Sequence, residues 1–172
     1  FIPESGLFVT DEIRLCFDGL DTIADIYLNG CLLGRADNMH RAWAYSVTGM
    51  LLRGENSLRI YFHSPVKYIR ERYAECVTMG SEHCMDGFPQ IRKAHCMFGW
   101  DWGPRLPDAG IWKNVFLQGV EKGRLESVYV AQEHEEQKVT LYIRTEIASA
   151  GETQEDRAKA QGLSYRVTVT DP

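Results

Sequence analysis

Hydrophobic and polar residues alternate one by one along the first part of the chain. Ile13, Leu15 and Phe17 occupy every second position of one such run, and the same alternation returns over residues 42–47 and 57–63. Successive side chains of a β-strand point to opposite faces, so a period of two is typical of half-buried strands. We therefore predict a strand at each of these three places.

A turn signal separates two further apolar runs. Residues 23–28 alternate as well, and Asn29-Gly30 stands directly before the next apolar residues. Asn-Gly favours a type I′ turn, because that turn needs positive φ at both central positions. The sequence therefore predicts a β-hairpin over residues 22–35.

A short helix is predicted over residues 65–75. Val66, Ile69 and Tyr73 are spaced by three and four positions, which places them on one helical face. Pro65 is compatible with a first helical turn, where a backbone N–H would have no helical partner in any case.

The regular pattern breaks between residues 76 and 110, where glycine and proline recur in an aromatic-rich stretch. A long irregular segment in a compact domain is typical of a binding loop. Strands are then predicted over residues 111–118, 127–132, 138–147 and 164–170. Many short strands with frequent turns indicate an all-β sandwich. Because three strands make a poor independent domain, we expect residues 1–121 to form one sandwich and residues 122–172 to begin a second, incomplete one.

Composition and charge narrow the classes of partner. The 172 residues are 44% hydrophobic and 25% charged, as in a globular chain, and the net charge is −5. Like charges do not form long runs, which argues against nucleic acid or an anionic membrane as a partner. Apolar stretches are all shorter than the roughly 20 residues of a membrane-spanning helix, and the first residues do not resemble a signal peptide. We expect neither nucleic acid nor a membrane as a partner.

The cysteines and the chain ends complete this picture. Five cysteines are an odd number, they are widely spaced, and a chain of this size needs no disulfide staples. A reducing, cytoplasmic compartment is therefore expected. The chain starts at Phe1 without a Met and stops at Pro172, so we also expect it to be a piece of a longer parent.

The segment richest in candidate chemistry runs from Gly99 to Gly103. Trp100 and Trp102 flank Asp101, and the glycine on either side allows the backbone to bend sharply. Indole faces stack on the apolar C–H patches of a sugar ring, and a carboxylate accepts hydrogen bonds from hydroxyls. This composition is suited to contact with a sugar. The alternative is that both indoles pack in the core or at a domain seam, and that Asp101 only caps a turn.

Two His-Cys pairs are weaker candidates for a metal site. His83-Cys84 and His95-Cys96 carry the ligand types that zinc prefers. Neither pair has the two-to-four-residue ligand spacing of a structural zinc site, so we expect no metal.

Two basic residues precede the aromatic segment. Arg92 and Lys93 are candidates to hydrogen-bond Asp101 or a sugar. The alternative for both is a solvated side chain or an ion pair with a local acid.

Several motifs of the chain resemble those of one enzyme family. They are GLDTIADIYLNG at residues 19–30, Gly34, Asn38, GENSL at residues 54–58, FGWDWGP at residues 98–104 and Gly-Ile-Trp at residues 110–112. The motifs up to residue 58 are similar to the jelly-roll sugar-binding domain that opens glycoside hydrolase family 2 enzymes, and FGWDWGP resembles the β-mannosidase branch of that family. The resemblance implies a jelly-roll β-sandwich over about residues 1–120, followed by part of an immunoglobulin-like sandwich.

The resemblance also implies a site that this chain shares with another domain. In such enzymes the loop bearing FGWDWGP reaches the substrate pocket of a separate (β/α)8 barrel. Trp100 is thereby assigned to the pocket wall, and Asp101 to hydrogen bonds with the hydroxyls of a terminal mannose in a mannose-containing saccharide. Trp102 is assigned to supporting the loop, as are Gly99 and Gly103.

The catalytic residues of this family lie elsewhere. Its members retain the anomeric configuration with two glutamates whose carboxyl groups are about 5 to 5.5 Å apart, and both belong to the barrel. We therefore expect no catalytic residue in this chain, no cofactor, and no hydrolysis by the chain alone. The family also has strands before the region matching Phe1, and an uncovered sheet edge or apolar face predicts self-association. Alternatives are a free-standing carbohydrate-binding module, a purely structural interaction domain, and another family 2 enzyme such as a β-galactosidase or β-glucuronidase.

Overall fold

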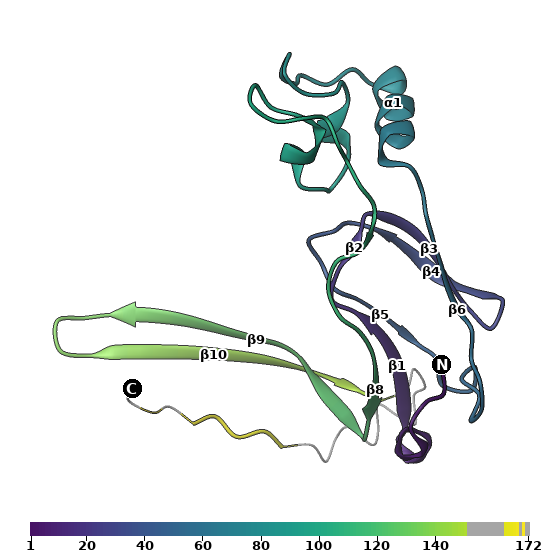
Figure 1. Ribbon diagram of the computed structural model, residues 1–172. Coiled ribbons are helices and arrows are strands. Elements are labelled where there is room, and N and C mark those ends of the chain that lie inside the picture. Colours follow the sequence, from purple (N-terminus) through teal and green to yellow (C-terminus); the bar gives the residue numbers. More distant parts are fainter. Residues whose placement is uncertain (151–163, 169, 171–172) are drawn as a thin grey trace.

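Two three-stranded antiparallel sheets form a sandwich in the computed structural model, which describes residues 1–150, 164–168 and 170 (Figure 1). One sheet has the order β5-β1-β8, with β1 (Glu12–Phe17), β5 (Trp43–Ser46) and β8 (Val115–Val120). The other has the order β4-β3-β6, with β3 (Ile23–Leu28), β4 (Cys31–Asp37) and β6 (Leu58–Phe62). The all-β sandwich predicted from the alternation is confirmed.

The core lies between the two sheets. Its buried members are Ile13, Leu15, Phe17, Leu20, Ala24, Ile26, Leu28, Ala36, Val47 and Leu51. Phe17 is fully buried, and its ring meets that of Tyr45 edge to face at 6.3 Å between centroids. The alternate residues of β1 and β3 thus supply the inward faces, as the period of two requires.

The β3–β4 hairpin turns where the sequence predicts it. Asn29 has φ 51° and Gly30 has φ 85°, so both central residues adopt the left-handed conformation of a type I′ turn. The Asn29 side chain also accepts a hydrogen bond from the backbone N–H of Ser57 at 2.9 Å. This bond ties the turn to the start of β6.

A second, smaller body projects from one end of the sandwich (Figure 1). It consists of α1 (Pro65–Glu75) and the irregular residues 76–109, which include the 3-10 turns η2 (Phe88–Gln90) and η3 (His95–Phe98). We call these residues, 65–109, the loop lobe. The predicted helix is confirmed at both ends, with the Ser64 hydroxyl accepting from the N–H of Lys67 at its start.

The loop lobe has a hydrophobic cluster of its own. Ile69, Ile91 and Phe98 are buried together, and Ile23 of β3 packs against them from the sandwich. The lobe is therefore a packed body even though most of its backbone is irregular.

Three parts of the fold differ from the sequence prediction. The strand predicted over residues 111–118 is two strands, β7 (Gly110–Ile111) and β8, because the backbone between them hydrogen-bonds residues 18 and 19 instead of a sheet. Two short elements were not predicted, η1 (Ser5–Val9) and β2 (Leu20–Asp21), the partner of β7. Residues 164–168 and 170 lie in no strand, so that prediction is wrong for them.

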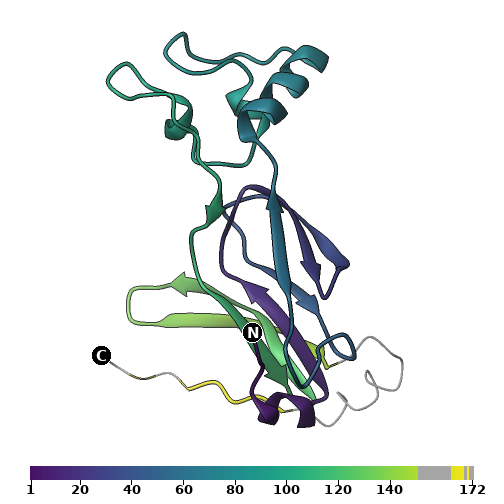
Figure 2. The ribbon, with the colours of Figure 1, turned by 45° about the vertical axis from the view of Figure 1, so that its right-hand side comes forward.

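The chain after the sandwich forms one long hairpin. β9 (Gly123–His134) pairs with β10 (Val139–Ser149), and Figure 2 shows the pair extending away from the sandwich. Apolar side chains on both of its faces are exposed, including Leu125, Tyr129 and Tyr142. Two strands do not bury such surface alone. That residues 122–172 begin an immunoglobulin-like sandwich stays a prediction.

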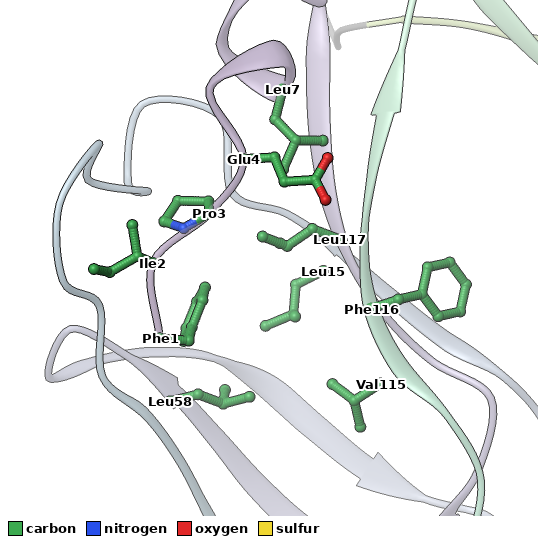
Figure 3. Close-up of a pocket in the computed structure, with 10 residues that line it drawn as sticks. All are labelled: Phe1, Ile2, Pro3, Glu4, Leu7, Leu15, Leu58, Val115, Phe116 and Leu117. Carbon is green, nitrogen blue, oxygen red and sulfur yellow. The ribbon is translucent and has the colours of Figure 1, made fainter.

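An apolar groove of about 500 Å³ opens between β8 and β6, beside the first residues of the chain (Figure 3). It is lined by Phe1, Ile2, Pro3, Glu4, Leu7, Leu15, Leu58, Val115, Phe116 and Leu117. β8 and β6 each end their sheet among the described residues, so unpaired strand edges border the groove. Self-association through this surface stays a prediction. None of the helices in the described part of the chain is long and apolar enough to cross a membrane.

Candidate functional site

A tight turn carries the predicted sugar-contacting residues. The N–H of Trp100 donates to the carbonyl of Gly103 at 3.3 Å, and the N–H of Gly103 donates to the carbonyl of Trp100 at 3.2 Å. Asp101 and Trp102 therefore stand at the tip of the turn. The turn belongs to the loop lobe, beyond the end of the sandwich (Figure 2).

All three side chains of the turn reach the surface. Trp100 is 46% exposed, Trp102 is 80% exposed, and Asp101 is exposed between them. The two indole rings lie 5.4 Å apart between centroids at an interplanar angle of 56°. Packing of both indoles in the sandwich core, one of the sequence alternatives, is thus not what the structure has. The individual roles assigned to these residues stay predictions.

The turn is anchored from within the lobe. Phe98, just before it, is fully buried in the lobe cluster. The carbonyl of Gly99 accepts a hydrogen bond from the Cys84 thiol at 2.8 Å. On the far side, the Arg105 guanidinium donates to the carbonyls of His83 at 3.2 Å and Glu82 at 3.1 Å. An exposed tip is therefore held on a fixed base.

The two glycines of the turn differ in how strongly the backbone requires them. Gly99 has φ 113°, and a Cβ there would lie 2.6 Å from Cγ of Arg105 and 2.8 Å from the carbonyl oxygen of His83. At Gly103 an added Cβ would lie 3.6 Å from Cβ of Trp100, an ordinary contact. Only Gly99 is required by its geometry.

The structure corrects the pairing considered for Lys93. Its side chain is fully buried, and its ammonium binds Asp21 of β2 and lies 3.4 Å from Oδ1 of Asp108. It does not pair with Asp101. Arg92 is exposed, as its solvated alternative requires. Sequence reasoning missed Asp21, because no local spacing links a residue of β2 to one in the lobe.

A second polar cluster was also missed. The buried carboxylate of Asp25 accepts from Nε of Arg35 at 2.8 Å and lies 2.9 Å from Nε2 of His63. A cavity of about 330 Å³ borders these groups and the start of α1. Both carboxylate oxygens of Asp25 therefore already have partners.

The two His-Cys pairs do not converge on a metal site. The Cys84 thiol is engaged by the Gly99 carbonyl, and the His95 ring lies edge-on to Phe88 at 5.0 Å between centroids. Across residues 1–150, 164–168 and 170, no three His, Cys, Asp or Glu side chains are grouped to hold a metal ion.

The thiols are expected to fall into two reactivity classes. All five cysteines are free; Cys31, Cys76 and Cys96 are exposed, and Cys16 and Cys84 are buried. Burial raises the pKa of the Cys16 thiol, so at neutral pH less of it is the reactive thiolate. We expect iodoacetamide to label the exposed set rapidly in the native protein and the buried pair only after denaturation. Mass spectrometry of timed digests checks this, and rapid native labelling of Cys16 would contradict it.

Comparison with known proteins agrees with this geometry. The family described as Glycosyl hydrolase 2 galactose-binding domain-like matches residues 2–113. A β-mannosidase of Mus musculus is 34% identical over 125 residues, which cover 67% of this chain and 14% of that protein. β-Mannosidase B of Emericella nidulans is 34% identical over 170 residues, covering 92% of this chain and 18% of that protein.

Solved structures also include a β-mannosidase that is similar to this chain. The crystal structure of a β-D-mannosidase from Dictyoglomus thermophilum superposes with a TM-score of 0.80 at 37% identity, covering 87% of this chain and 18% of that one. A β-glucuronidase from an uncultured Clostridium species shares the fold, with a TM-score of 0.60 at 19% identity. The chain spans only 14% to 18% of the length of the β-mannosidases described here. The chain belongs to the galactose-binding domain-like family of glycosyl hydrolase 2, and within that family it is β-mannosidase-like.

Proposed function

We propose that this chain is the non-catalytic N-terminal part of a β-mannosidase-type glycoside hydrolase and that its exposed turn completes the substrate pocket. The observation that carries the proposal is the Trp100–Gly103 turn, whose aromatic and acidic tip is exposed while its base is anchored. An exposed pair of indoles around a carboxylate is costly to leave in water unless a ligand or a neighbouring domain meets it. A sugar held between this turn and a neighbouring domain would cover both the indoles and the carboxylate.

Each side chain of the turn has a defined task in this proposal. Trp100 forms part of the pocket wall and packs its ring on the apolar face of the terminal mannose. The Asp101 carboxylate accepts hydrogen bonds from two sugar hydroxyls, and their positions distinguish one epimer from another. Trp102 lies against Trp100 and supports it, and the backbone of Gly99 and Gly103 sets the bend.

The chemistry itself belongs to the rest of the parent protein. The parent hydrolyses terminal, non-reducing β-D-mannose residues with retention, through two carboxyl groups on a (β/α)8 barrel and without a cofactor. Residues 1–121 form the sugar-binding domain, and residues 122–172 begin the next sandwich. The relatives described above that are 34% to 37% identical to this chain are all β-mannosidases, and this supports mannose as the sugar.

A panel of chromogenic glycosides tests the proposed activity. We expect the full-length protein that contains this chain to hydrolyse p-nitrophenyl β-D-mannoside with a kcat/KM at least about tenfold above that for the β-galactoside or β-glucuronide, since each hydroxyl contact to the reacting sugar counts in the transition state. The chain alone is the control and is expected to be inactive. Equal or greater activity on the galactoside or glucuronide would contradict the mannose assignment.

The exposure of both indoles on the isolated chain favours one second candidate, a free-standing carbohydrate-binding module. Calorimetric titration of the chain with mannose and mannobiose separates the two. Binding at millimolar concentration or tighter supports the module, because such a platform needs no other domain. Absence of binding supports the first proposal, in which the turn forms only part of a pocket that another domain completes.

A further inference from the structure

A buried ammonium joins the sandwich to the lobe. The Lys93 side chain is 0% exposed, and its Nζ donates to Oδ2 of Asp21. The other oxygen of Asp21 accepts a hydrogen bond from the Thr22 hydroxyl. Nζ also lies 3.4 Å from Oδ1 of Asp108, whose side chain is 78% exposed. The lysine therefore has one buried and one exposed carboxylate as partners.

The ion pairs of Lys93 with Asp21 and Asp108 lie where the two ends of the segment that carries the Trp100–Gly103 turn meet the sandwich. On the entry side, the N–H of Met39 donates to the carbonyl of Arg92 at 3.0 Å. On the exit side, Gly110 pairs with Asp21 in the β2–β7 ladder. Lys93 and Asp108 thus flank the segment 94–107 at the two places where it adjoins the sandwich. The Lys93 ammonium connects these two places.

A buried ion pair of this kind contributes geometry more than stability. Desolvating an ammonium and a carboxylate costs about as much as their attraction returns, so such a pair is a weak stabiliser. Its hydrogen bonds are directional, however, and a charged partner cannot move away without leaving an unpaired charge in the interior. The position of the entry stem relative to β2 is therefore fixed more tightly than apolar packing alone would fix it.

We propose that Lys93 is the positioning residue of the substrate pocket: by holding Asp21 and Asp108, it sets where Trp100 and Asp101 stand relative to the sandwich. This inference rests on the function proposed above. Lys93 does not touch the sugar and acts through the turn. A displacement of about 1 Å at a pocket residue lowers turnover by up to about 10²-fold, so a small shift of the stems is measurable.

The experiment uses the full-length enzyme with p-nitrophenyl β-D-mannoside. The double variant Lys93→Met/Asp21→Asn removes both buried charges together and leaves neither unpaired. Asp108→Asn is a milder change at an exposed residue, and it keeps the inference testable if the double variant does not fold. Asp86→Asn, at another exposed acid of the same lobe, is the matched control.

We expect kcat/KM to fall roughly tenfold in the double variant and about threefold in Asp108→Asn, with Asp86→Asn unchanged. If Lys93 acts through the turn, these losses shrink to less than about twofold when Asp101→Ala is already present, because residues acting as one unit are not additive. Equal losses in both backgrounds would show a merely structural role and overturn the inference.

Hydrogen exchange supplies a readout that does not depend on activity. Amides of residues 94–107 are expected to exchange faster in the double variant, while those of β1 and β3 stay protected. Unchanged exchange over 94–107 would overturn the inference even if activity falls. If Asp101→Ala itself leaves kcat/KM unchanged, the proposed function fails, and the exchange measurement still decides whether Lys93 holds the loop.

Discussion

Replacing Asp101 with alanine in the full-length enzyme is expected to lower kcat/KM for a β-mannoside by about 10²-fold or more. The carboxylate is exposed at the tip of a turn with its base anchored, so its removal is expected to leave the fold intact and to delete only the proposed contact to the sugar. Hydrogen bonds from the hydroxyls of the reacting ring are strengthened in the transition state, which makes their loss visible in turnover as well as in binding. Steady-state kinetics with the chromogenic mannoside measures it.

Two further variants serve as an intermediate and as a control for this substitution. Asp101→Asn keeps an acceptor oxygen without the charge, and its kcat/KM is expected to lie between those of the wild type and Asp101→Ala. Asp86→Ala removes an exposed carboxylate elsewhere in the lobe and is expected to leave kcat/KM within about twofold of wild type. An Asp101→Ala enzyme as active as the wild type would contradict the proposed role of the turn and would favour a structural interaction domain.

The second large effect is expected at Gly99. Its φ of 113° and ψ of 162° lie in a region that only glycine adopts readily, and alanine there costs about 1–3 kcal/mol. The new Cβ also collides with the His83 carbonyl, to which Arg105 donates. We expect Gly99→Ala to displace the turn and to lower kcat/KM by about 10²-fold, measured with the same substrate.

Gly103→Ala is the matched control for this substitution. It adds the same methyl group on the other side of the turn, where the nearest atom is Cβ of Trp100 at 3.6 Å. Both backbone hydrogen bonds between residues 100 and 103 survive the change. Activity within about threefold of wild type is therefore expected. A Gly103→Ala enzyme as impaired as Gly99→Ala would show that the turn tolerates no side chain at all, and would remove the geometric reason given for Gly99.

Local patterns were sufficient for most of the sandwich and the helix. The Asn29-Gly30 turn and the helix over residues 65–75 depend on neighbours a few positions away, and both predictions are confirmed. The strand expected at 111–118 was wrong because Trp112 leaves the sheet and lies against Gly19, a residue far away in sequence. Residues 164–168 and 170 alternate like a strand but have no strand partner in the structure.

In the candidate site, too, the local feature was predicted from the sequence and the long-range contact was not. The aromatic turn was found because its composition suits a sugar and because FGWDWGP at residues 98–104 resembles the β-mannosidase motif; composition alone left packing of the indoles as an alternative. The ion pair between Lys93 and Asp21 spans 72 residues and has no periodic signature. The sequence therefore left three interpretations open for Lys93, a bond to Asp101 or a sugar, a solvated side chain, and a pair with a local acid, and none of them predicted this buried, distant partner. Long-range ion pairs depend on which elements the chain brings together, and only the folded structure shows that.

The sandwich and the loop lobe keep separate hydrophobic clusters, with Ile23 as the sandwich residue that packs on the lobe. Local opening can therefore occur in one cluster while the other stays closed. This separation predicts that substitutions around the turn disturb the sandwich core less than substitutions within that core do. A change in the lobe can thus alter what the turn contacts while the sandwich keeps its fold.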